Sequence, residues 1–172
     1  DGSTNVPEPK VRPGATLEMP EQLLRLAVDH AELIDGMLQW NEEKIKLQGM
    51  AEDVAVELVY KLGNSAANHH YDGSVKVGKV RVLLPELEPL TLSVAAEFRL
   101  YRDRVDVPRM RMSEGKSWVE AAGAVSELNS PVAQFKYRAA ADLGELAGLA
   151  RYSRLRGGTV QLNGQGTYRW ER

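Results

Sequence analysis

Apolar and polar residues alternate over long stretches of this chain. The clearest run places Leu90, Leu92, Val94, Ala96, Phe98 and Leu100 at every second position. Because successive side chains of a β-strand point to opposite faces, this period of two predicts a strand with one apolar face and one polar face. Two other stretches keep the same period and add Val54, Val56, Leu58 and Tyr60, and then Val160, Leu162, Gly164, Gly166, Tyr168 and Trp170.

The alternation changes phase at two places within otherwise regular runs. Val75 and Val77 belong to one phase, and Val80, Val82 and Leu84 belong to the other. A similar change occurs at Pro108. One extra residue in a strand turns the following side chains to the opposite face, so the first change predicts a β-bulge. The proline at the second change predicts either an edge strand or a bulge.

Turn-forming residues separate the runs, which predicts an antiparallel meander. Several runs reach ten residues or more, against a usual strand length of ~5–6. A short helix is predicted near 142–151, where leucines are spaced by three, Asp142 can cap the first turn and Glu145 follows three residues later.

The predicted fold class is therefore mainly β, a long antiparallel meander with one short helix. Its apolar face needs cover, which a closed barrel, a sandwich or a deeply curved sheet folded on itself would each provide.

The first part of the chain differs in composition from the rest. Pro7, Pro9, Pro13 and Pro20 fall within residues 1–22, and proline removes backbone donors, so we expect a linker or an extended edge segment there. Residues 23–172 are expected to form a single β-rich domain. The opening sequence suggests a cut inside a longer polypeptide.

Composition narrows the range of functions. The formal net charge of −2 provides no basic field for nucleic acid, and the chain contains no cysteine, which excludes disulfides and thiolate chemistry. No apolar run approaches the ~20 residues of a transmembrane helix.

Residues that could carry catalysis are not arranged for it. His69 and His70 are adjacent, a spacing that does not easily place two imidazoles on one metal, and we expect a solvated loop there. His30 falls on the alternating stripe and is expected to be either interfacial or partly buried with a partner. The acidic residues cluster at predicted turns, and no Gly-x-Ser-x-Gly motif is present. We therefore expect neither an enzyme nor a cofactor or metal site.

Several motifs in the second half of the chain follow one another in an order that is typical of a known protein family. They are a glycine-containing strand (118–125), a proline-marked turn (129–131), the segment 135–138 leading into Asp142-Leu143-Gly144-Glu145-Leu146, and a glycine-rich strand (157–166). In this order the chain resembles the AsmA/TamB superfamily of envelope proteins. The resemblance covers most of residues 24–172.

The resemblance implies a curved, elongated, β-taco-like sheet with an apolar groove, in a protein tethered to the inner membrane through a part of the chain not present here. It further implies a periplasmic location and phospholipid transport between the inner and outer membranes, or a role in outer-membrane biogenesis. The partners implied are phospholipid acyl chains, neighbouring β-modules of the same chain and outer-membrane assembly proteins. The alternative is a non-catalytic β-sandwich or scaffold module that binds protein and buries the same stripe as its core.

The residues expected to line the lipid groove share the apolar phase of their runs. They are Val54, Val56, Leu58, Tyr60, Leu90, Leu92, Val94, Ala96, Phe98, Leu100, Val160 and Leu162.

Overall fold

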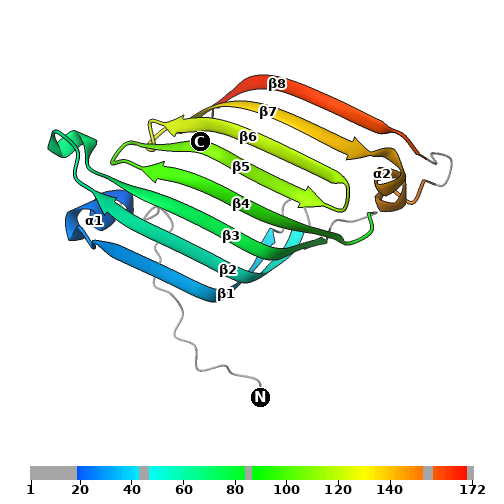
Figure 1. Cartoon of the computed structure of the whole chain (residues 1–172), viewed down its shortest axis with the longest axis horizontal. Coiled ribbons are helices and arrows are strands. Elements are labelled where there is room, and N and C mark those ends of the chain that lie inside the picture. Colours follow the sequence, from blue (N-terminus) through cyan, green and yellow to red (C-terminus); the bar gives the residue numbers. More distant parts are fainter. Residues whose placement is uncertain (1–18, 43–46, 84–86, 153–156, 170–172) are drawn as a thin grey trace, which may run out of the picture.

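The computed structural model describes residues 19–42, 47–83, 87–152 and 157–169. They form one antiparallel sheet of eight strands whose order in the sheet is the order along the chain (Figure 1). The strands are β1 (His30–Glu42), β2 (Leu47–Lys61), β3 (His70–Leu83), β4 (Leu90–Leu100), β5 (Arg104–Glu114), β6 (Ser117–Ser126), β7 (Val132–Asp142) and β8 (Thr159–Arg169). The predicted mainly β meander is confirmed.

The sheet does not close on itself within the described residues. β1 pairs with β2 alone and β8 pairs with β7 alone, so these two strands form the edges. The shortest strand has 10 residues and the longest has 15, as the long alternating runs predict.

Both changes of phase are β-bulges in the structure. Pairing between β3 and β4 jumps from Val77 with Val94 to Val80 with Leu92, which leaves Gly78 and Lys79 outside the regular register. Pairing between β5 and β6 shifts in the same way on either side of Pro108. β1 and β2 carry further irregularities at Asp35 and Asp53, whose φ angles are +54° and +55°. Bulges bend the strand that contains them and increase its twist.

The sheet bends around its apolar side. The ends of β1 and β2 near residues 42 and 47 pass behind β3 in Figure 1. Ala51, Val77 and Val80 form a buried cluster, against which Trp40 from β1 packs. All four residues lie on the face that the alternation predicts to be apolar, so the bend partly encloses that face.

The structure corrects the expectation for the segment before β1. Residues 19–22 are not extended, because they begin helix α1 (Met19–Leu26). Pro20 occupies the first turn of this helix, where its missing N–H costs no hydrogen bond and its fixed φ suits the helix. The rest of the predicted linker, residues 1–18, lies outside the described residues.

The other short helical elements lie between strands. Helix α2 (Leu143–Leu149) confirms the predicted helix, and the carboxylate of Asp142 accepts a hydrogen bond from the backbone N–H of Glu145 at 3.0 Å, as expected for its cap. A single 3-10 turn, η2 (Ala66–Asn68), precedes β3.

A candidate apolar binding face

One face of the sheet is apolar across all eight strands. Directly paired residues of neighbouring strands lie side by side on the same face, so the register defines rows that cross the sheet. The central row consists of Gly36, Val54, Val77, Val94, Met112, Val119, Ala139 and Leu162. This row contains no polar side chain. We call the whole side of the sheet that contains this row the apolar face.

The structure brings all the predicted groove residues together on this face. Val54, Val56, Leu58 and Tyr60 come from β2, and their partners on β3 pair in turn with the alternating residues of β4. Val160 and Leu162 extend the same face on β8 through Ala141 and Ala139 of β7.

Sequence reasoning missed the contributions of β1 and β7 to the apolar face. On β1 the face includes Leu33 and Leu38, which are five positions apart because two register shifts interrupt the period of two. On β7 it includes Phe135 and Tyr137. These two aromatic residues do alternate with polar neighbours, so their pattern was available in the sequence.

Aromatic rings on the apolar face lie over glycines of the neighbouring strand. A Cβ atom placed on Gly73 would lie 2.3 Å from Cζ of Phe98, its partner on β4. Tyr137 lies over Gly164 in the same way, where an added Cβ would meet the ring at 2.9 Å. Gly164 therefore allows close approach, as its position inside a strand predicts. Trp40 over Gly49 and Phe135 over Gly166 repeat the arrangement.

The apolar face is covered at its centre and open at its flanks. Val77 and Val80 are each 9% exposed. By contrast, Leu38 on β1 is 59% exposed and Leu162 on β8 is 54% exposed. A ligand therefore has direct access to the apolar face along both edge strands.

A short helix lies at each end of the strands. At one end the hydroxyl of Tyr71 is hydrogen-bonded to the backbone of Leu23 and Val28, which hold α1 against β3. At the other end the backbone N–H of Glu88 donates to the carbonyl of Leu149, which ties α2 to the segment before β4.

The carboxylate of Glu145 fixes α2 to the β5–β6 turn. It accepts hydrogen bonds from the backbone N–H of Lys116 at 2.8 Å and from the hydroxyl of Ser117 at 2.6 Å. The Ser117 hydroxyl, followed by the Lys116 N–H, lowers the pKa of Glu145 below its usual value.

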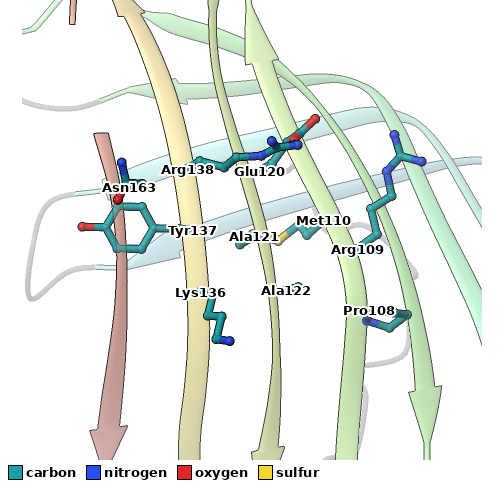
Figure 2. A pocket seen from close by; sticks show the side chains of 10 residues that line it. All are labelled: Pro108, Arg109, Met110, Glu120, Ala121, Ala122, Lys136, Tyr137, Arg138 and Asn163. Carbon is teal, nitrogen blue, oxygen red and sulfur yellow. The ribbon is translucent and has the colours of Figure 1, made fainter. Parts of the chain in front are cut away.

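The opposite face of the sheet is polar and carries cross-strand ion pairs. Glu120 on β6 binds Arg111 of β5 and Arg138 of β7, and Figure 2 shows Arg138 and Glu120 extending toward each other. Hydrogen bonds from Arg138, and then from Arg111, lower the pKa of Glu120. Lys79 with Glu52 and Arg99 with Asp72 are further pairs on this face. These cross-strand ion pairs therefore lie on the side of the sheet opposite the apolar face.

The histidines are more ordered than the sequence suggests. His69 Nδ1 lies 2.8 Å from the Tyr60 hydroxyl, and the ring of His70 stacks on Tyr101 with 4.8 Å between centroids. His69 lies in the loop before β3, as predicted, but is partly buried beside Tyr60. His70 is the first residue of β3 and not part of a loop. His30 is 52% exposed, so the alternative of partial burial is wrong, although its Nε2 does have a partner in a Glu57 carboxylate oxygen at 3.4 Å. It lies on the polar face of an edge strand.

Among the described residues, no group of three or more His, Asp or Glu side chains could hold a metal ion. No helix in the described part of the chain is long and apolar enough to span a membrane.

No protein-family model, curated protein or solved structure matches this chain. The resemblance to the AsmA/TamB superfamily therefore stays a prediction.

Proposed function

We propose that the apolar face binds phospholipid acyl chains, and that the chain is a segment of a periplasmic envelope protein that carries phospholipid between the inner and outer membranes or serves outer-membrane biogenesis. The observation that carries this proposal is the row of eight residues from Gly36 to Leu162, which crosses every strand without a polar side chain.

The energetics of a single-layer sheet support a ligand on this face. Removing apolar surface from water is favourable by about 25 cal/mol per Å². Monomeric proteins rarely expose a contiguous apolar patch larger than a few hundred Å². Leu33 and Leu38 on β1 and Leu162 on β8 are all at least half exposed, so cover over both flanks would be stabilising.

The chemistry of the apolar face suits hydrocarbon chains. Its side chains are mainly Val, Leu, Ala and Met, which bring no hydrogen-bonding group into contact with a ligand. The hydroxyls of Tyr60 and Tyr71 are at one end of the strands and already have partners, in His69 and the backbone of α1. Tyr137 of β7 also contributes a hydroxyl to this face, so acyl chains meet a surface that is apolar apart from tyrosine hydroxyls.

The second candidate function is a scaffold that binds protein strands. The edges formed by β1 and β8 support it, because an edge strand presents unpaired backbone groups that can pair with another strand. Ile34 and Met37 of β1 are 63% and 73% exposed, which adds apolar surface beside that edge. Neighbouring β-modules of the same chain and outer-membrane assembly proteins are the partners that these edges would bind.

A pair of matched substitutions on β8 tests lipid binding. Leu162 and Gln161 are adjacent, exposed and on opposite faces. We expect Leu162→Asp to weaken binding of a fluorescent fatty acid by about tenfold, since a carboxylate placed against hydrocarbon loses its water. Gln161→Asp should leave binding unchanged. Equal binding by wild type and both variants would favour the scaffold function.

A further inference from the structure

The polar face is hollowed over β5 to β8. Two adjoining hollows of about 510 Å³ and 790 Å³ lie there, within the ~300–1,000 Å³ typical of ligand sites. Ala122 and Ala124 of β6 form the floor, because their side chains are too short to fill the space between the longer residues of β5 and β7.

Two cations flank this floor. Lys136 of β7 pairs directly with Ala122, and in Figure 2 its side chain extends from β7 toward β6. Arg109 is in the β5 bulge opposite the same stretch of β6, between the pairs Val107 with Gly123 and Met110 with Ala121. Since neighbouring strands are ~4.8 Å apart, β5 and β7 are separated by ~9.6 Å. Both long side chains can therefore reach one group held above Ala122.

These two cations have no ion-pair partner among the described residues, unlike their neighbours. Arg111 and Arg138 are bound to Glu120. Glu97 is the cross-strand neighbour of Arg109, but no ion pair joins them. The hollows and the adjoining surface thus combine five cations (Lys76, Arg109, Arg111, Lys136 and Arg138) with two carboxylates (Glu97 and Glu120), a net positive site on a chain with net charge −2.

We propose that this hollow binds a phosphate group above Ala122, held by Arg109 from one side and Lys136 from the other. Arginine matches phosphate through two parallel N–H donors, and lysine binds it as a point charge. Gln165 of β8 pairs with Lys136 and places an amide beside the same position. The phosphate could belong to a soluble ester or to a lipid headgroup, because the chemistry that recognises it is the same.

Glycerol 3-phosphate and phosphatidylglycerol vesicles distinguish the two sources. Calorimetric titration of the whole chain with the soluble ester and co-sedimentation with the vesicles are each measured at low and at physiological salt. Binding to both probes assigns the site to free phosphate esters, and binding to vesicles alone assigns it to headgroups. Binding of either probe should weaken as the salt concentration rises, because the contacts are exposed to solvent.

Variants locate the site. Arg109→Gln and Lys136→Gln should each weaken binding by about tenfold, and Arg81→Gln, which removes the same charge from a distant part of the polar face, should change it less than twofold. The proposal is overturned if neither probe binds wild type, or if Arg81→Gln weakens binding as much as the other two variants. Binding of fatty acid to the apolar face is read out separately at Leu162, so the two proposals can fail independently.

Discussion

The hydroxyl of Tyr71 joins the sheet to the helix that precedes it. It donates a hydrogen bond to the carbonyl of Leu23 at 3.0 Å and accepts one from the backbone N–H of Val28 at 2.9 Å. Tyr71 is 1% exposed, so its hydroxyl makes both hydrogen bonds away from solvent. One buried side chain on β3 thus holds α1 across more than forty residues of sequence.

Replacing Tyr71 with Phe keeps the ring and removes both hydrogen bonds. We expect a loss of about 1–3 kcal/mol in the free energy of unfolding, because two backbone groups lose their partner. Hydrogen exchange of residues 19–28 should accelerate, while exchange in β5 and β6 should not. Tyr60→Phe is the matched control, since it removes a hydroxyl bonded to His69 and not to α1. Unchanged exchange over residues 19–28 in Tyr71→Phe would show that α1 is held by other contacts.

Gly123 and Gly148 should respond in opposite directions to alanine. A Cβ on Gly123 would lie 2.2 Å from the backbone oxygen of Gln134, and backbone cannot yield as a flexible side chain can. We expect Gly123→Ala to destabilise the fold by about 1–3 kcal/mol. Gly148 in α2 has no atom within 4 Å of such a Cβ, so Gly148→Ala should stabilise by about 0.5–1 kcal/mol through helix propensity. Urea unfolding midpoints measure both, and a stabilising Gly123→Ala would contradict the β6–β7 packing.

The contact between α2 and the β5–β6 turn should depend on pH. Hydrogen bonds from Ser117 and Lys116 lower the pKa of Glu145 in the folded state, so the ionised carboxylate stabilises the fold. That stabilisation is fully present above the ordinary value near 4.5 and is lost as the pH falls through the lowered folded-state pKa.

The difference in melting temperature between wild type and Glu145→Gln, measured from pH 7 to pH 3, reports this contact. Wild type should be the more stable protein at pH 7, and the difference should shrink below about pH 4.5. A difference that is constant across the range would mean that the charge of Glu145 does not matter.

The strands and their faces could be predicted because alternation is a local property of the sequence. The runs at Val54–Tyr60 and Leu90–Leu100 define both the strand and the face that becomes apolar. The same reasoning works less well for β1, where the bulges around Asp35 and Gly36 break the period.

Features that depend on distant residues could not be predicted. Helix α1 is short and contains Pro20, and its contact with Tyr71 joins residues far apart in the sequence. The hollow over Ala122 is formed because the β5 bulge and the β6–β7 register bring Arg109 and Lys136 to either side of it, and no single run of sequence contains that relationship. Trp170, predicted to continue the alternation of Val160 to Tyr168, lies outside the described residues.

Photo-crosslinking in cells tests lipid binding by the apolar face most directly. A reactive side chain at Val94 lies in the central row of the apolar face, and one at Ser93 lies on the polar face, beside Ser113. If the apolar face binds lipid, Val94 captures phospholipid and Ser93 does not. Capture of protein alone at Val94, or equal capture of lipid at both positions, would contradict it.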